Sequence, residues 1–172
     1  MTLAHHAAQQ LALVDASAET CIRQAENLMR NFRTERIQAQ KRWFDEMQRR
    51  GVMRGSHSKG TWCPLALFAR LHNGSLQIYW QLVFRDRATR SVGYKHLAKR
   101  RQGGYDLRTL LAHANDFERD LVAEYEEEAQ LQRQRWQALM SVRRALRQLE
   151  VANGKQGALM RRISGAETQE KT

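Results

Sequence analysis

Proline, cysteine and long apolar runs are all scarce in this chain of 172 residues. Pro64 is the single proline, and Cys21 and Cys63 are the two cysteines. Two isolated cysteines match neither a disulfide framework nor a zinc motif, so we expect two small buried thiols in a reducing compartment. No run approaches the roughly 18 apolar residues of a membrane span, and the first residues lack a signal-peptide pattern. The sequence therefore predicts a cytoplasmic protein with no membrane partner.

Acidic residues are few relative to basic ones. The chain has 29 Lys and Arg against 18 Asp and Glu, which gives a formal net charge of +11. A chain this basic usually meets a polyanion, nucleic acid first and an anionic membrane surface second; a solvated basic protein without such a partner is the alternative. The apolar fraction of 42% is enough for a core. We expect a single domain over residues 1–165 and a disordered tail over residues 166–172.

Residue patterns that support catalysis are also missing from the sequence. A relaxase-type nuclease would need a His-x-His pair on a strand to hold its metal, and no such pair is present. The glutamates from Glu124 to Glu128 form a run on one expected helix, which is typical of a solvated face rather than of an acid/base pair. The Gly51–Gly60 loop does not match a phosphate-binding Walker A pattern. We expect no catalytic residue, no metal site and no cofactor, so the sequence predicts a protein that is not an enzyme.

Two long helices are expected to flank a small sheet. Residues 3–49 contain no Gly or Pro, and their apolar positions alternate in steps of three and four, typical of a helix that packs along another helix. A second helix is expected over residues 107–153, after Asp106 as N-cap and before an αL stop at Asn153-Gly154. We expect the two helices to pair antiparallel within one chain, with a dimeric coiled coil as the alternative.

The sheet, over residues 61–99, begins with a β-hairpin. Asn73-Gly74 stands between two apolar runs, and this pair favours the type I′ turn that joins two antiparallel strands. His72 should then face Ser75, and the alternate residues Leu65, Leu67, Trp80 and Leu82 should line the core face. The other face should carry Phe68 opposite Tyr79 and Arg70 opposite Gln77.

A third strand should follow, with a register that the sequence leaves open. If Ser91 opposes Phe84, Tyr94 and His96 lie beside Gln81 and Tyr79 on the non-core face. In the alternative register they join the apolar side. Two helices around a three-stranded antiparallel meander make an α+β fold.

Basic residues gather around this third strand, with aromatic residues between them. Lysine and arginine supply salt-dependent affinity for phosphates, and an antiparallel ribbon fits the major groove of DNA. The Gly51–Gly60 loop adds further positive charge near backbone amides that can approach phosphates. A solvated basic loop is the alternative interpretation. The candidate DNA-binding residues are Arg54, Lys59, Arg85, Arg87, Arg90, Tyr94, Lys95, His96, Lys99, Arg100 and Arg101.

Four short motifs resemble the MobI-like conjugative transfer (mobilisation) family, and the resemblance spans roughly residues 61–147. They are Ser75-Leu76-Gln77-Ile78-Tyr79-Trp80, Tyr94-Lys95-His96-Leu97, Gly103-Gly104-Tyr105 and Phe117-Glu118. The chain has Asp106 where the family tends to have Pro, and Phe117 where it favours Trp.

The resemblance implies a non-enzymatic accessory protein of conjugative transfer. Such a protein would bind double-stranded DNA at the origin of transfer and help to assemble or recruit the relaxase complex. A homodimer on a repeated site is a further expectation, because the long helices offer extra apolar seam. Two alternatives stay open: a protein–protein adaptor that docks partners on the last helix, and an RNA-binding module that uses the sheet face with Tyr79 and Tyr94.

Overall fold

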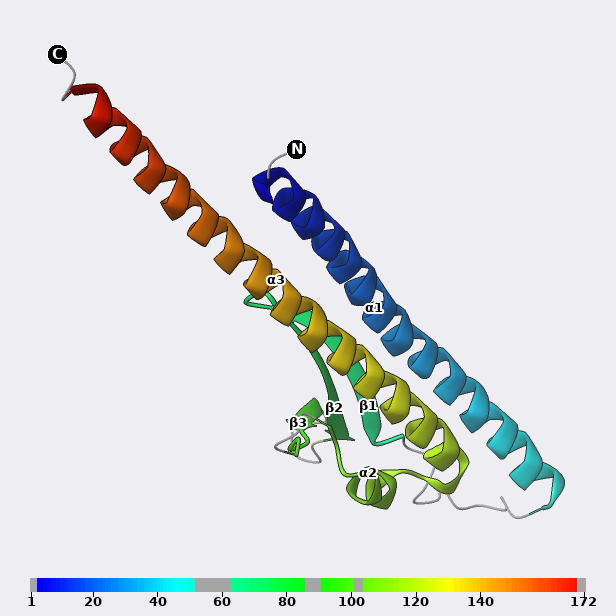
Figure 1. The fold of residues 1–172 in the computed structure, drawn as a ribbon. Helices are drawn as coiled ribbons and strands as arrows, with labels where there is room; N and C mark the ends of the chain where they lie inside the picture. Colours follow the sequence, from blue (N-terminus) through cyan, green and yellow to red (C-terminus); the bar gives the residue numbers. More distant parts are fainter. Residues whose placement is uncertain (1–2, 52–62, 86–90, 101–103, 170–172) are drawn as a thin grey trace. The chain divides into compact units, whose positions relative to one another are not determined.

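The computed structural model describes residues 3–51, 63–85, 91–100 and 104–169. The elements, in order, are α1 (Leu3–Arg49), β1 (Leu65–His72), β2 (Ser75–Arg85), β3 (Val92–His96), α2 (Leu107–His113), the 3-10 turn η1 (Asp116–Glu118) and α3 (Arg119–Gln169) (Figure 1). This is the predicted α+β architecture, and the predicted bounds of the first helix are confirmed. The chain forms two compact units, one from Cys21–Gln134 and the other from the two ends of the chain.

The predicted helix over residues 107–153 is wrong at its start, because the chain there forms two helices. Ala114 leaves α2 in an extended conformation with ψ of 141°. Asn115 then caps η1 in a capping box, in which its backbone N–H donates to Glu118 Oε1 at 3.2 Å. The reciprocal bonds stabilise a new helix start at this point. Asp106 does occupy the N-cap position of α2, and its carboxylate accepts from the Thr109 hydroxyl at 3.2 Å.

The predicted end of the second helix is also wrong. Gly154 does not adopt a positive φ, and α3 continues through it to Gln169. A lone glycine inside a helix costs only about 1 kcal/mol, which neighbouring helix-forming residues can offset. The predicted tail over residues 166–172 therefore overlaps the end of α3, and residues 170–172 lie outside the described residues.

The hairpin has the predicted register in all of its pairs. Leu65 lies opposite Leu82, Leu67 opposite Trp80, and His72 opposite Ser75. Asn73 and Gly74 have φ of 48° and 69°, the left-handed values that a type I′ turn needs.

Strand β3 places Tyr94 and His96 on the non-core face, as in the first predicted alternative. Their partners on β2 differ from the predicted ones. His96 lies opposite Gln81, Tyr94 opposite Val83, and Gly93 opposite Phe84. The pairing of Ser91 with Phe84 is therefore wrong by two residues. A Cβ on residue 93 would lie 2.5 Å from the Phe84 ring, so glycine is the residue that suits this position.

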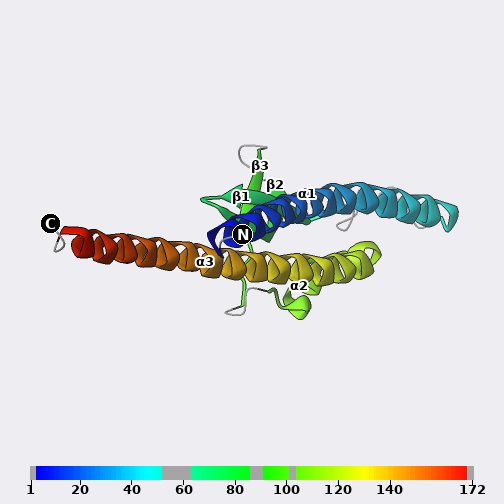
Figure 2. The ribbon, with the colours of Figure 1, turned by 45° about the horizontal axis from the view of Figure 1, so that its top comes forward.

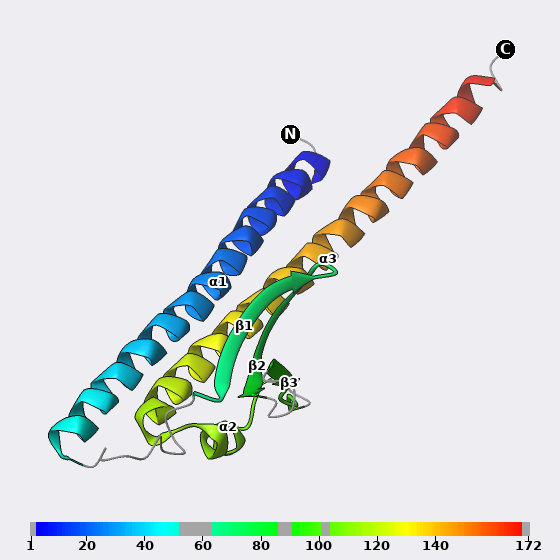
Figure 3. The ribbon, with the colours of Figure 1, turned by 180° about the vertical axis from the view of Figure 1, so that it is seen from behind.

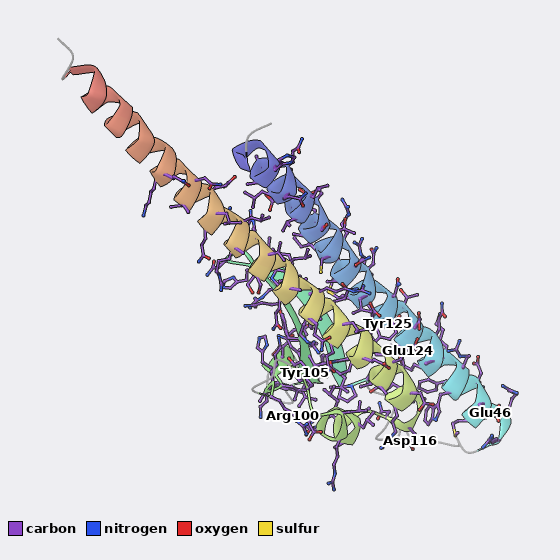
Figure 4. The ribbon with its side chains drawn as sticks, in the orientation of Figure 1. Glu46, Arg100, Tyr105, Asp116, Glu124 and Tyr125 are labelled. Carbon is purple, nitrogen blue, oxygen red and sulfur yellow. The ribbon has the colours of Figure 1, made fainter. Side chains whose placement is uncertain are left out.

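Within the Cys21–Gln134 unit, α1 and α3 pack antiparallel on one face of the sheet. The Tyr125 hydroxyl donates to Glu35 Oε1 at 2.8 Å, and Cys21 Sγ lies 3.5 Å from Gln132 Oε1. Residue numbers therefore increase along α1 in the direction in which they decrease along α3. Tyr125 projects from α3 toward α1 (Figure 4). In the other unit, Arg143 and Asp15 form an ion pair with an N–O distance of 2.8 Å.

The core of the Cys21–Gln134 unit is aromatic. Phe32 makes edge-on contacts with Trp80 at 4.9 Å and with Tyr125 at 5.2 Å between ring centroids. Trp80 and Ile78 are fully buried, together with Leu65. The predicted core face of the hairpin is thus the face that the helices cover. Seen from behind, the strands lie in front of α3, with β1 nearest to α1 (Figure 3).

Candidate nucleic-acid interface

The sheet face away from the helices carries four rings in contact, Phe68, Tyr79, Tyr94 and His96, which we call the aromatic face. Phe68 stacks on Tyr79 with 5.7 Å between centroids and 14° between planes. The rings of Tyr79 and His96 are 4.9 Å apart, and those of Phe68 and Tyr94 are 6.1 Å apart and perpendicular. Tyr94 is 57% exposed. Flat rings held in one exposed layer can stack against nucleobases.

Arginines lie on the same face as these rings. The Arg70 guanidinium is 5.3 Å from the centroid of Tyr79, and its Nε donates to Gln77 Oε1 at 3.1 Å. Arg85 is exposed, and its pairing opposite Val92 puts it on the same face as Tyr94. His96 is held by Gln81, with 3.0 Å between His96 Nε2 and Gln81 Nε2. The aromatic face thus combines stacking surface with cations that can contact phosphates.

The structure brings together some of the predicted DNA-binding residues and separates others. Tyr94, His96 and Arg85 share the aromatic face, whereas Lys95, opposite Leu82, points to the other side of the sheet. The ammonium of Lys99 lies 5.9 Å from the centroid of Tyr105 instead. The other predicted residues, Arg54, Lys59, Arg87, Arg90 and Arg101, lie outside the described residues.

Lys99 and Arg100 are tied to the segment that leads into α2. Desolvation, and then the nearby Arg133, lower the pKa of the Lys99 ammonium. Arg100 forms an ion pair with Asp106 at 2.8 Å, and its backbone N–H donates to the Gly104 carbonyl at 2.8 Å. Arg100 and Tyr105 lie close together beside α2 (Figure 4). Both cations thus have partners of their own in the protein, which reduces what they can offer to DNA.

A buried polar network fixes Tyr105 and β2 against α3. Glu126 accepts hydrogen bonds from Trp80 Nε1 at 2.7 Å, from the Tyr105 backbone N–H at 3.1 Å and from Arg133 at 2.5 Å. The Tyr105 hydroxyl accepts from the Trp80 backbone N–H at 3.1 Å, and burial raises the pKa of that hydroxyl. Arg133 also donates to the Ile78 carbonyl. The network sets the position of β2 relative to α3, and so the position of the aromatic face.

A second group of polar side chains lies at the start of β1. Arg36 donates to the Leu65 carbonyl, and Glu118 is fully buried nearby. Burial, together with the negative charge of Glu118, raises the pKa of the Cys63 thiol to about 12. Burial raises the pKa of Glu118 as well. Cys63 is half-buried rather than buried as predicted, but its thiol stays protonated and therefore a poor nucleophile.

Phe68 and Arg70 are not among the predicted binding residues, although both lie on the aromatic face. The period-two alternation of the hairpin had already placed them on the non-core face with Tyr79. That face was therefore available as a signal in the sequence. The segment from β3 to α2 drew the prediction instead because its charges are consecutive.

Other kinds of site find little support in the described part of the chain. There, no three His, Cys, Asp or Glu side chains gather closely enough to hold a metal ion. Across the same residues, no helix has the length and apolar character to cross a membrane.

Comparison with known proteins identifies a family for this chain. A family model described as MobI protein matches residues 23–147. Neither the curated proteins nor the solved structures contain a match to the chain. The matched residues cover the sheet, its two flanking helical segments and the buried network around Glu126.

Proposed function

Because the chain belongs to the MobI family of conjugative mobilisation proteins, we propose that it is a DNA-binding accessory protein that recognises the double-stranded origin of transfer. In this role it helps to assemble or recruit the relaxase and performs no catalytic step itself. DNA reaches the protein in the cytoplasm, where conjugative transfer begins.

The aromatic face is the observation that carries this proposal. It joins four contacting rings to Arg70 and Arg85 on the side of the sheet away from the helices, in a chain of net charge +11. The arginines supply affinity for phosphates, and His96 and Arg70 have donors that can reach base edges when a β-ribbon enters the major groove. Figure 2 shows the three strands gathered beside α1 and α3.

A competition experiment tests recognition of the origin. A labelled duplex that covers the origin of transfer is titrated with the protein, and unlabelled origin or scrambled duplex of equal length is added as competitor. Specific recognition gives at least a roughly thousandfold preference for the origin at physiological salt. Equal competition by the two duplexes would leave only non-specific binding, and absence of binding to any duplex would favour the adaptor alternative.

A further inference from the structure

A groove of about 420 Å³ opens between α1 and the aromatic face, where the edge strand β1 runs nearest to α1 (Figure 3). Its volume lies within the roughly 300–1,000 Å³ of ordinary small-molecule sites. All of its lining residues belong to the Cys21–Gln134 unit. They include Phe68, Val83 and Tyr94 from the sheet and Arg30, Arg33 and Arg36 from α1.

The two walls of this groove differ in chemistry. The sheet wall presents the perpendicular rings of Phe68 and Tyr94, and Tyr94 is 57% exposed. A base that enters the groove can stack on one ring and meet the edge of the other.

The helix wall is cationic. Arg30 and Arg33 are exposed and stand one helical turn apart on α1, so they project in similar directions. Glu26 lies 3.5 Å from Arg30, but both side chains are about half exposed or more, so the pair is weak. Arg36 is already bound to the Leu65 carbonyl. The groove therefore offers at least two cations beside two rings, which complements an anion that carries a flat ring.

We propose that this groove binds one unpaired nucleotide of single-stranded DNA, with its base against Tyr94 and Phe68 and its phosphates at Arg30 and Arg33. The inference rests on the proposed function, because it takes DNA as the polyanion. A paired base is stacked inside the duplex and cannot enter such a groove, so the nucleotide must come from an opened strand or be flipped out. The protein would then hold a melted segment of the origin as well as its duplex.

The experiment measures binding of the full chain to a fluorescent oligothymidine by anisotropy at low salt. Tyr94→Ala should weaken binding about tenfold, which is the loss of one base stack, and Arg33→Gln should lower the salt dependence by about 0.7 in log–log slope. Matched controls are Leu71→Ala, an exposed apolar side chain of β1 on the opposite face of the sheet, and Arg42→Gln, an exposed arginine half a turn round α1 from Arg33. Both controls should bind oligothymidine with an affinity within about twofold of that of the unmodified protein. Arg42→Gln should also keep the salt slope of the unmodified protein.

Four other results would contradict the groove as the site, DNA as the ligand, or DNA binding as a whole. If Tyr94→Ala and Arg33→Gln bind oligothymidine like the unmodified protein, or lose no more than their controls, the groove is not the site. Tighter binding of oligouridine than of oligothymidine overturns DNA in favour of RNA. If the protein binds duplex DNA but not single strands, the groove proposal is wrong and the proposed function still stands. If it binds neither, both proposals are wrong. Thermal unfolding of each variant shows that a loss does not come from misfolding.

Discussion

Glu126 connects three separate segments of the Cys21–Gln134 unit. Its carboxylate joins Trp80 on β2, Tyr105 before α2 and Arg133 on α3, and both it and Arg133 are almost fully buried. Removal of one member of a buried ion pair leaves the other charge without compensation in a poorly solvated place. This one side chain therefore contributes to the placement of β2 against α3.

We predict that Glu126→Ala lowers the free energy of unfolding by about 3–5 kcal/mol, because it strands the Arg133 charge and two N–H donors. Urea unfolding followed by circular dichroism measures the change. Glu127→Ala, at the exposed neighbouring position, is the control and should change stability by about 0.5 kcal/mol or less. If Glu126→Ala lowers the free energy of unfolding by less than about 1 kcal/mol, the buried hydrogen bonds of Glu126 do not stabilise the fold as we propose.

Glu118 makes the stability of the fold depend on pH in the opposite direction from a carboxylate whose pKa is lowered by folding. Burial raises its pKa above the ordinary value of 4.5, so the folded protein binds the proton more tightly than the unfolded chain. Its stabilising contribution is complete below that value and is lost as pH rises through the raised pKa. Glu118→Gln keeps the capping box and removes the titration.

We predict that the stability of Glu118→Gln relative to the unmodified protein increases as pH rises from about 4 to 7. Urea unfolding of both proteins across this range gives the difference. Comparison between the two cancels the contributions of the other carboxylates, such as Glu46, whose pKa is lowered by its bond to Arg50 and by Arg49. A difference that stays flat or falls with pH would show that Glu118 is not desolvated in the folded protein.

At the scale of elements, the helix α3 shows what residue patterns can and cannot predict. The alternation that identified α1 and the hairpin is local, so residues 3–49 and the register around Asn73-Gly74 followed from the sequence. The break before Asp116 also had a local signal, the capping box from Asn115 to Glu118, which the predicted continuous helix passed over. The end of the helix did not, because Asn153-Gly154 suits both a stop and a tolerated glycine.

Gly154→Ala tests the course of α3 through this position. Because Gly154 is helical and an added Cβ would meet no atom within 4 Å, alanine should stabilise the helix by about 0.5–1 kcal/mol. Circular dichroism should show equal or greater helicity and a higher melting temperature. Gly74→Ala, at φ of 69°, is the contrasting variant and should destabilise the protein. If Gly154→Ala also destabilises, the helix ends there as the sequence first indicated.

The third strand and the interface needed information that no local pattern holds. In the register of β3, the Phe84 ring lies over Gly93, a contact that no local sequence pattern announces. Likewise, Arg30 and Arg33 line the groove only because α1 runs beside β1. The predicted cluster from Arg85 to Arg101 was chosen by closeness in sequence, and the pairing of β2 with β3 divides it between the two faces of the sheet.

At the scale of the whole molecule, a net charge of +11 gives general attraction to polyanions but does not say where DNA lies. We propose the aromatic face as that place, because it has rings and arginines together. The exposed arginines of α3, such as Arg135 and Arg144, belong to the other unit and carry the same charge. Equal charge changes at the two places therefore separate general attraction from a defined interface.

The most direct test is the salt dependence of duplex binding by two matched double variants. We predict that Arg70→Gln with Arg85→Gln reduces the log–log salt slope by about 1.8 and weakens binding to the origin duplex, since each phosphate contact adds about 0.9 to the slope. The control pair, Arg135→Gln with Arg144→Gln, should retain the slope of the unmodified protein. Equal slopes for the two double variants, or a larger loss in the control pair, would contradict an interface on the aromatic face.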